Sequence, residues 1–404
     1  MTTRTALISG AGIAGATAAF WLDRAGYDVT VVERARSARK GGQTVDLRGA
    51  GRDIARRMGV YDEVVARSVH QRGIANVDDA GTIRATMGVE AFGGNGIISE
   101  VEILRGDLAD ILLEAVQDRI QIIWDDSVTA IADGPTGVTV EFERSRPARF
   151  DLVVGADGSH STVRRLAFGP EPDFVRPLGA YQAWFTTQDS VDLDNWYQMY
   201  RAPGGLVASL RPGRLPGEAK ASLCFRADPG TDLGIDRRDP VAVRRLIRER
   251  FAGVTGWNVP WLLDALDTAT DVTFDSMDQV RMDSWTRGRV ALIGDAACAP
   301  GAVTGMGTSL ALVGAYVLAG DLQRAGGDHT AAFRRYEQIM RPYVDQAQQL
   351  PPGGIGGYAP QSRLMIALGN LSLRSMTRWP MRPLLEKQFS KADAIELPDY
   401  STVA

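Results

Sequence analysis

The sequence predicts an α/β (α+β) fold, in which a domain with a βαβ unit is interleaved with a second domain built on an antiparallel sheet, followed by C-terminal helices. Three observations predict this class. A strand–helix–strand pattern opens the chain, short apolar strands return near residues 151 and 289, and aromatic-rich strand patterns fill the region from 176 to 283. A chain of 404 residues is long enough to bury a sizeable core in one large domain or two interleaved ones.

The first pattern is the βαβ unit. The apolar run Thr5–Ser9 predicts a buried strand, residues 14–24 predict a helix, and Asp28–Val32 predicts a second strand. Residues 5–22 carry no charge, but glycines interrupt the run and a polar strand–turn pattern follows it. A strand that enters a helix therefore explains the segment better than a signal peptide or a membrane span.

A glycine motif, Gly10-x-Gly12-x-x-Gly15, lies between the first strand and the helix. Gly10 permits the tight turn, Gly12 lets the backbone approach a pyrophosphate, and Gly15 lets helix and strand pack closely. The N–H groups and dipole at the helix amino terminus attract the phosphates. Glu33, at the end of the second strand, is placed to accept a hydrogen bond from a ribose hydroxyl. The unit predicts a Rossmann-like dinucleotide site without distinguishing FAD from NAD.

Helix and strand patterns alternate between this motif and residue 155. A glycine-rich loop covers residues 41–49, and residues 70–100 are polar and strand-like. Three alternating segments from Ile120 onward are expected to form a small antiparallel sheet. In order, the expected elements are a helix at 51–58, a helix at Gly106–Gln117, the strands Ile120–Trp124, Val128–Ala132 and Val138–Phe142, and the buried strand Asp151–Gly155.

Two glycine–aspartate motifs follow buried strands. Gly155-Ala156-Asp157-Gly158 ends the first of these strands, and Gly294-Asp295 ends the strand Arg289–Gly294. An aspartate at a strand end can accept hydrogen bonds from ribose or ribityl hydroxyls, so both acids favour FAD. Either aspartate alone could equally be a turn residue or a helix cap.

The third motif continues into a glycine-lined turn. Pro300, Gly305 and Gly307 precede a helix at 308–318, whose first N–H groups could face the electron-rich edge of a reduced flavin. Helical patterns extend to about residue 348. A Pro/Gly-rich break follows, and an amphipathic tail at 361–389 closes the chain; Met365, Met376, Trp379 and Met381 in it are interpreted as packing residues.

The region from 176 to 283 predicts a second antiparallel sheet with a helix at Pro240–Phe251. Its strands are expected at Tyr181–Thr187, Trp196–Tyr200, Leu206–Leu210 and Ala221–Ala227. Aromatic content here suits a flat or polycyclic ligand held between this sheet and the cofactor. The candidate lining residues are Gln182, Trp184, Phe185, Tyr197, Met199, Ser209, Arg211 and Phe225, each of which could instead be ordinary sheet core or surface.

Composition excludes several other functions. The net charge of -4 and the scattered basic residues argue against nucleic acid as a partner. Cys224 and Cys298 match no metal spacing, and the three histidines, at 70, 160 and 329, stand singly, which argues against a metal site or a Ser-His-Asp triad. Two cysteines form no disulfide framework, so a cytoplasmic location is expected.

The three motifs together resemble the signatures of class A, single-component FAD-dependent aromatic monooxygenases, which have the p-hydroxybenzoate hydroxylase fold. The resemblance covers about residues 4–345 and includes Ser161 and Arg164 after the second motif and Ala296 and Pro300 in the third. Arg105 matches an arginine that this family places near the FAD. The loop at 42–46 followed by a helix at Gly51 looks most like the branch that acts on polycyclic antibiotics, including tetracycline-inactivating enzymes, which points to antibiotic biosynthesis or resistance.

The chain departs from this family at two places. Gly305-Met306-Gly307 lacks the asparagine that often follows the glycine pair of the third motif, so the local flavin contact stays open. The chain also leaves little room for the thioredoxin-like domain of larger relatives.

The resemblance implies an NAD(P)H-dependent flavoprotein hydroxylase. NAD(P)H would reduce the FAD and leave, and O2 would form a flavin hydroperoxide that hydroxylates an aromatic or polycyclic polyketide-like molecule, so no catalytic side chain need exist. The alternatives are a Baeyer–Villiger oxygenase, an oxidase or a reductase on the same fold, or a flavin-binding module without turnover. The expected cofactor-binding residues are Gly10, Gly12, Ile13, Ala14, Gly15, Glu33, Arg34, Asp46, Arg105, Asp157, Gly158, Arg164, Gly294, Asp295, Pro300, Gly305, Met306 and Gly307.

The resemblance also fixes an expected domain division. The FAD-binding domain would comprise residues 1–70, 100–175 and 284–350, the substrate domain would comprise 71–99 and 176–283, and a helical tail would cover 351–404.

Overall fold

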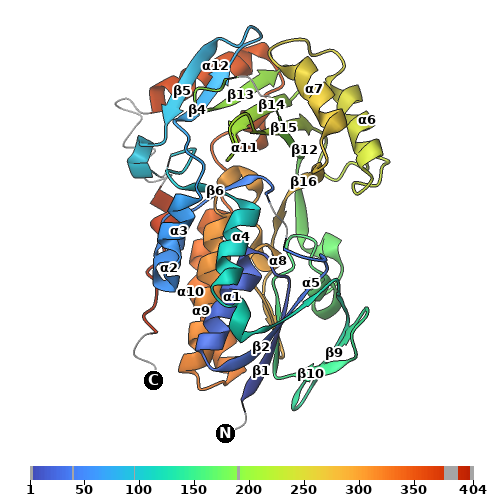
Figure 1. The fold of residues 1–404 in the computed structure, drawn as a ribbon, viewed down its shortest axis with the longest axis vertical. Coiled ribbons are helices and arrows are strands. Elements are labelled where there is room, and N and C mark those ends of the chain that lie inside the picture. Colours follow the sequence, from blue (N-terminus) through green and yellow to red (C-terminus); the bar gives the residue numbers. More distant parts are fainter. Residues whose placement is uncertain (1–2, 39–40, 95, 189–191, 377–389, 401–404) are drawn as a thin grey trace.

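The structure of the protein, a computed structural model, describes residues 3–38, 41–94, 96–188, 192–376 and 390–400. In Figure 1 a mostly parallel sheet packed against long helices forms the lower part, and a large sheet that is antiparallel except for the pair β13–β4, with helices at its sides, forms the upper part. This combination confirms the predicted fold class. No helix among the described residues is long and apolar enough to cross a membrane.

The lower part is organised around a six-stranded sheet. Its strands are parallel except for the edge pair β17–β18, and the βαβ strands lie at its centre. Because parallel strands end at the same sheet edge, the residues after β1, β11 and β18 meet there, and these residues are the three glycine motifs. The strand order is β17 (Thr286–Arg287), β18 (Val290–Leu292), β11 (Leu152–Gly155), β1 (Arg4–Ser9), β2 (Tyr27–Glu33) and β7 (Gln121–Trp124).

The assignment of residues 120–124 to a small antiparallel sheet is wrong. These residues form β7, which pairs in parallel with β2, from Thr30 opposite Gln121 to Glu33 opposite Trp124. The remaining two segments do form an antiparallel sheet, with β10 as its third strand. Alternation of polar and apolar residues identifies a strand but not its partner, so the sequence left this pairing open. The small sheet consists of β8 (Val128–Gly134), β9 (Gly137–Phe142) and β10 (Ala148–Phe150).

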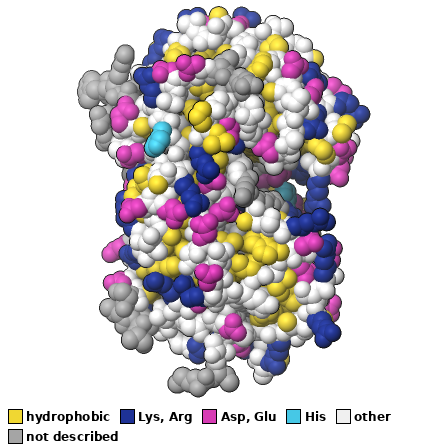
Figure 2. Space-filling view, in the orientation of Figure 1, with side chains coloured by type: hydrophobic (Ala, Val, Ile, Leu, Met, Phe, Trp, Pro, Cys, Tyr) yellow, Lys and Arg dark blue, Asp and Glu magenta, His cyan; other side chains and the backbone are white. Residues whose placement is uncertain are grey.

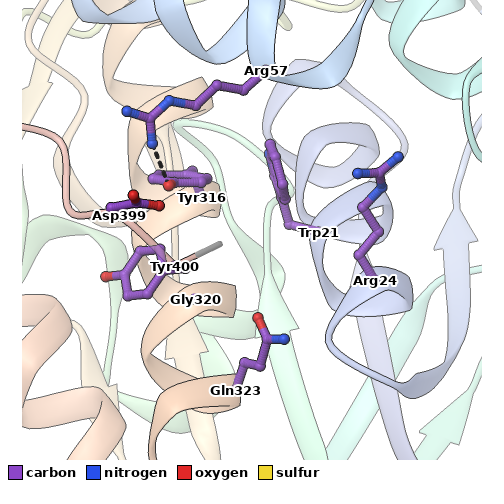
Figure 3. Close-up of a pocket in the computed structure, with 8 residues that line it drawn as sticks. All are labelled: Trp21, Arg24, Arg57, Tyr316, Gly320, Gln323, Asp399 and Tyr400. Atoms are coloured by element: carbon purple, nitrogen blue, oxygen red, sulfur yellow. Dashed lines mark hydrogen bonds between the residues drawn. The ribbon is translucent and has the colours of Figure 1, made fainter. Parts of the chain in front are cut away.

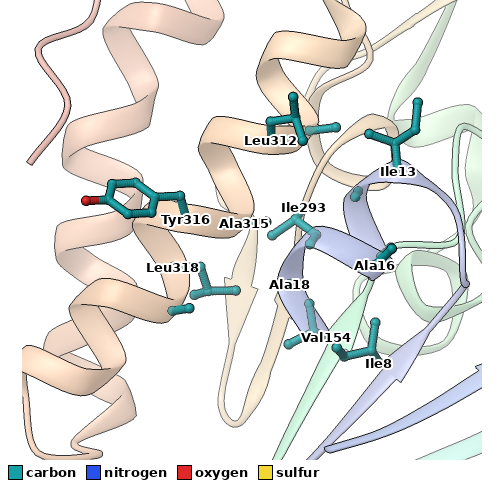
Figure 4. Close-up of a cluster of buried hydrophobic side chains, with 14 of the residues drawn as sticks. Ile8, Ile13, Ala16, Ala18, Val154, Ile293, Leu312, Ala315, Tyr316 and Leu318 are labelled. Carbon is teal, nitrogen blue, oxygen red and sulfur yellow. The ribbon is translucent and has the colours of Figure 1, made fainter. Parts of the chain in front are cut away.

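Helices cover one face of the parallel sheet and bury the main core. α9 is buried continuously from Thr308 to Leu322, because it lies between α1, α2 and α10. Figure 4 shows small residues of α1, Ala16 and Ala18, between the strands and α9, where they allow the two helices to approach closely. The helices are α1 (Ile13–Arg24), α2 (Ala50–Met58), α3 (Tyr61–Ala66), α4 (Arg105–Glu114), α9 (Gly307–Arg324) and α10 (His329–Ala347).

The upper part is a seven-stranded sheet. Strands from residues 73–88 join those from 175–280, so two distant segments build one sheet. α6 (Pro240–Phe251) and α7 (Val259–Thr268) bury one face, and α11 (Gly354–Tyr358) and α12 (Arg363–Met376) contact the other. The order is β16 (Thr273–Val280), β12 (Val175–Thr187), β15 (Ala219–Arg226), β14 (Leu206–Pro212), β13 (Trp196–Ala202), β4 (Gly73–Val77) and β5 (Ile83–Gly88).

Short elements connect the two parts. β3 (Thr44–Asp46) and β6 (Glu102–Leu104) form a two-stranded sheet directly before α4, and α5 (Thr162–Ala167) and α8 (Asp295–Cys298) follow the second and third motifs. In the tail, Met376 packs as expected, but Met365 is 42% exposed on the solvent side of α12, so its interpretation as a packing residue is wrong. Trp379 and Met381 lie outside the described residues.

Candidate functional site

The first glycine motif contains two kinds of position. A Cβ at Gly10, where φ is +105°, would lie 2.7 Å from the Ala156 carbonyl oxygen, and one at Gly15 would lie 1.8 Å from the Gly10 carbonyl oxygen. These two glycines are therefore required by backbone packing. A Cβ at Gly12 would find no atom nearer than Arg105 Nη2, at 3.9 Å. Gly12 thus faces open space at the start of α1, where no side chain caps the helix.

The acidic residue at the end of β2 stabilises this turn. The Glu33 carboxylate accepts hydrogen bonds from the backbone N–H of Ala11 and of Ala35, each at 2.9 Å. Its expected bond to a ribose hydroxyl stays a prediction, and the bond to Ala11 is an additional role. Arg34 is exposed, whereas the side chains of Ile13 and Ala14 are buried, which leaves their backbone to face a ligand.

The polar groups of the second motif form hydrogen bonds mainly with residues that follow it directly in the chain. The Asp157 carboxylate accepts hydrogen bonds from the Ser161 hydroxyl and from the N–H of Thr162 and Val163, so it caps α5. Arg164 is fully buried and donates from Nη1 to the Ala296 carbonyl at 3.0 Å. The second motif is thereby tied to the third through Arg164, and the expected contacts of Asp157 and Arg164 with the cofactor stay predictions.

The third motif places an acid beside Arg105. Asp295 begins α8 and is exposed to solvent, yet burial among surrounding protein atoms raises the pKa of its carboxyl while Arg105 lowers it. Asp295 Oδ1 also lies 3.7 Å from where a Cβ of Gly307 would be, at the start of α9. Gly12, Arg105, Asp295 and Gly307 therefore converge from four different elements, and we call them the cradle.

The cradle has the chemistry that FAD requires. Gly12 and Arg105 offer a helix amino terminus and a cation to a diphosphate, and Asp295 offers a hydrogen-bond acceptor to hydroxyls. Gly294, where φ is +57°, leaves room for the Ala14 methyl group 2.9 Å from its missing Cβ, so the motifs also pack on one another.

Residues at the far side of the third motif connect it to the upper sheet. A Cβ at Gly305 would lie 2.8 Å from Asp46 Oδ2, and Asp46 is paired with Arg48 at 3.2 Å. Met306 is buried, and the Pro300 carbonyl accepts a hydrogen bond from Gln279 Nε2 at 2.8 Å. Asp46, Pro300 and Met306 thus hold the loop that carries Gly305 and Gly307.

Most of the candidate substrate residues lie on one face of the seven-stranded sheet. Cross-strand pairs place their side chains together, because paired residues point to the same side. Trp184 is opposite Ser222, Ser222 is opposite Ser209, and Ser209 is opposite Met199. The residues that share this face, which we call the inner face, are Gln182, Trp184, Tyr197, Met199, Ser209 and Arg211.

Phe225 and Phe185 belong to the opposite face, so their assignment to the ligand side is wrong. Phe225 stacks on Tyr181 at a ring-centroid distance of 5.7 Å and lies in the core under α6 and α7. The side chains of a strand alternate between its faces, and Phe225 is one residue out of phase with Ser222 and Cys224. An aromatic-rich strand pattern does not by itself reveal which face a ligand uses.

Arg211 joins the inner face to the cofactor side. Its guanidinium lies 3.8 Å from the Tyr197 ring centroid, and Nη1 donates to the hydroxyl of Thr44 and, at 2.7 Å, to Glu102 Oε2. The sequence reasoning missed Glu102, although an acid in a short apolar strand directly before Arg105 was a usable signal. It also missed Arg201, whose Nη1 donates to Asn76 Oδ1 at 2.7 Å on the same face.

A separate cavity of about 690 Å³ lies away from the cradle, between α1, α9 and the C-terminal segment. Figure 3 shows Trp21 and Tyr316 among its lining residues, with their rings in edge-to-face contact at a centroid distance of 4.9 Å and with Arg57 bound to Tyr316. Figure 2 shows acidic and basic side chains interspersed on the face of the molecule that includes the lower helices. This surface fits a protein whose chemistry lies inside rather than on an extended charged patch.

Comparisons with known proteins agree with this geometry. The profile of a family described as FAD binding domain matches residues 3–349. An uncharacterised protein of Mycobacterium tuberculosis is 41% identical over 359 residues, covering 88% of this chain and 95% of that protein. A flavin-dependent monooxygenase of Legionella longbeachae is 38% identical and covers 85% and 86%. The crystal structure of tetracycline destructase Tet(51) superposes with a TM-score of 0.81, at 32% identity, covering 99% of this chain and 100% of that one.

Proposed function

The chain belongs to the FAD-binding-domain family of flavin-dependent monooxygenases, and we propose that it uses NAD(P)H and O2 to hydroxylate an aromatic or polycyclic polyketide-like molecule. One observation carries the proposal: a continuous run of contacts, from Gly305 through Asp46, Glu102 and Arg211, connects the cradle to the inner face. A cofactor in the cradle and a substrate on the inner face would therefore be neighbours.

The cradle residues would hold FAD in the following way. Gly12 and the amino terminus of α1 would bind the diphosphate with Arg105, and Asp295 would accept hydrogen bonds from hydroxyl groups. The first N–H groups of α9, at Gly307, would face the electron-rich edge of the ring system. Bound FAD supplies the redox chemistry, with NAD(P)H as the transient reductant and O2 as the second substrate.

The inner face would bind the organic substrate. Trp184 and Met199 offer flat or adaptable apolar contacts, while Gln182 and Arg211 offer hydrogen bonds that fix orientation. The buried sheet around them would keep water from the reacting centre. The likeness to a tetracycline destructase supports a polycyclic substrate. In this proposal residues 71–99 and 176–283 form the substrate domain. Residues 1–70, 100–175 and 284–350 form the FAD-binding domain, and the C-terminal tail follows from residue 351.

The proposal is tested by NADPH and NADH oxidation with the FAD-loaded protein. A panel of phenols and linear polycyclic polyketides, tetracyclines included, would be assayed under 18O2 with product mass recorded. Substrate-stimulated oxidation with one 18O atom in a hydroxyl group of the product is the expected result. Stoichiometric H2O2 without product would assign an oxidase instead, and a ring-expanded ester would assign a Baeyer–Villiger oxygenase.

Replacement of the cradle cation tests the cofactor side separately. An Arg105→Met variant keeps an unbranched apolar side chain but loses the guanidinium charge beside Gly12, so we expect FAD to dissociate about 10- to 100-fold more readily. Fluorescence titration of the apoprotein with FAD measures the change. Arg84→Met is the matched control, because Arg84 forms a half-exposed pair with Asp78 on β5, away from the cradle. Equal FAD affinity in the two variants would show that Arg105 does not contribute to FAD binding.

A further inference from the structure

Two acidic residues face each other inside the protein, between the cradle and the inner face. Asp46 and Glu102 occupy opposite positions on the paired strands β3 and β6. Glu102 is 2% exposed, and its Oε2 accepts hydrogen bonds from Arg211 Nη1 at 2.7 Å and from Gln71 Nε2. Asp46 Oδ1 accepts a hydrogen bond from the N–H of Ser99 at 3.1 Å. Neither acid is a surface charge.

The surroundings of the two acids differ, and so do their protonation states. Burial would raise the pKa of Asp46, but Arg48, the hydrogen bond with Glu102, Arg211 and the Ser99 N–H together lower it. Burial raises the pKa of Glu102 to about 7 against the pull of Arg211, and the negative charge of Asp46 adds to the rise. Two neighbouring carboxyls in a buried site do not readily ionise together, so the pair retains one proton up to neutral pH.

This arrangement leaves Arg211 with a charge that is not fully balanced. The ionised Asp46 is shared between Arg48, at 3.2 Å, and Arg211, and a protonated Glu102 contributes no charge to its contact with Arg211, so one carboxylate faces two cations. The other groups that face Glu102 are uncharged Gln71 and, through Arg211, Tyr197. Arg211 itself remains protonated at all accessible pH values. The Arg211 side chain is 24% exposed, and its guanidinium lies over the ring of Tyr197 on the inner face.

We propose that Glu102 is a positioning residue that orients Arg211 and, by keeping its proton, leaves the Arg211 charge available for an anionic oxygen of the substrate, such as an enolate, phenolate or carboxylate. The inference rests on the proposed function, because it takes the inner face as the substrate side. It assigns to Glu102 a role distinct from that of the cradle residues. Arg211 touches the ligand, and Glu102 acts through Arg211.

The sign of the pH dependence follows from the charge balance. Well below pH 7 Glu102 is neutral and Arg211 attracts an anion. As pH rises through the Glu102 pKa of about 7, Glu102 ionises, neutralises Arg211 and weakens anion binding. A neutral ligand of the same shape has no such dependence. Because linkage is reciprocal, binding of an anion at pH 7 also raises the pKa of Glu102 and takes up a proton from solution.

The experiment uses the FAD-loaded protein with two planar probes, 2-naphthoate and 2-naphthamide, whose binding is followed by the change in flavin absorbance between pH 5.5 and 8.5. We expect the dissociation constant of 2-naphthoate to rise about tenfold across this range and that of 2-naphthamide to stay constant. Glu102→Gln cannot ionise, so it should bind 2-naphthoate at all pH values as tightly as the parent does at pH 5.5. Glu114→Gln, on the exposed side of α4, is the matched control and should retain the parent's dependence.

Several results would overturn the inference. An unchanged pH dependence in Glu102→Gln would assign the titration to another group, and equal or undetectable binding of the two probes at every pH would reject the anionic substrate class. If Glu102→Gln does not fold, Arg211→Met provides the test, because it should remove the preference for 2-naphthoate over 2-naphthamide. None of these outcomes affects the oxygenase assay, which decides the proposed function through NAD(P)H consumption and 18O incorporation.

A second measurement needs no ligand. The raised pKa stabilises the folded protein fully below the ordinary glutamic acid pKa of about 4.5, and this stabilisation is lost as pH rises through 7. The melting temperature of Glu102→Gln relative to the parent should therefore increase between pH 5 and pH 8. A constant difference over that range would contradict the protonation state on which the inference depends.

Discussion

A Gly12→Val variant is expected to fold like the parent protein but to purify without FAD. A Cβ at this position meets nothing nearer than Arg105 Nη2 at 3.9 Å, and the backbone at φ −77° is open to any residue. The isopropyl group would instead fill the space in which the backbone approaches a diphosphate. We expect FAD affinity to fall at least about 100-fold, equivalent to about 3 kcal/mol.

Flavin absorbance after purification and circular dichroism of the same sample measure the two parts of this prediction. Gly12→Ala is the graded control, because a single methyl group intrudes less, and it should retain part of the FAD. A yellow Gly12→Val protein with a full complement of FAD would place the diphosphate elsewhere. An unfolded Gly12→Val protein would show that Gly12 is needed for packing rather than for the ligand.

A Gly15→Ala variant, unlike Gly12→Val, is expected to lose the stability of the folded protein. The new Cβ would lie 1.8 Å from the Gly10 carbonyl oxygen, and Gly10 cannot move away because its own N–H is bound to the Val32 carbonyl at 2.8 Å. Separating α1 from β1 would disturb the most buried part of the core. We expect a loss of about 3 kcal/mol or more in the free energy of unfolding, which places the variant mostly in inclusion bodies.

Urea unfolding of the soluble fraction, or the yield of soluble protein when none can be purified, measures this effect. Gly26→Ala is the matched control: a Cβ at Gly26 meets no atom within 4 Å, so its cost arises only from the backbone at φ +84°. A Gly15→Ala protein as stable as the parent would mean that α1 and β1 are not held at the distance described here.

The cofactor half of the site could be predicted from the sequence because its signals are local. Gly10, Gly12 and Gly15 are separated by fixed spacings, and the strand before each motif is a short apolar run. Parallel strands that end in motifs must bring those motifs to one edge, which predicts that Asp295 lies at the same edge as Gly12. Arg105 was expected near the cofactor from the family resemblance alone, and the structure places it beside both Gly12 and Asp295.

The substrate half could be predicted only in part, because its signals depend on which face and which partner a strand has. Phe225 and Phe185 were assigned to the ligand side. Each is directly adjacent in its strand to a residue of the inner face, so its side chain points to the opposite face, into the core under α6 and α7. Residues 120–124 were assigned to the wrong sheet for a related reason: their pattern matches any half-buried strand, and the partner β2 lies nearly 90 residues earlier in the chain.

The sequence by itself determined the fold class and the family and predicted the cofactor-binding residues, since each depends on short-range spacing of glycine, acid and apolar residues. Only the tertiary structure decided that Asp157 caps α5, that Arg164 ties the second motif to the third, and that Glu102 lies between Asp46 and Arg211. Those roles arise from burial and from contacts between distant elements. A buried carboxyl acquires its protonation state from neighbours that the chain brings together only on folding.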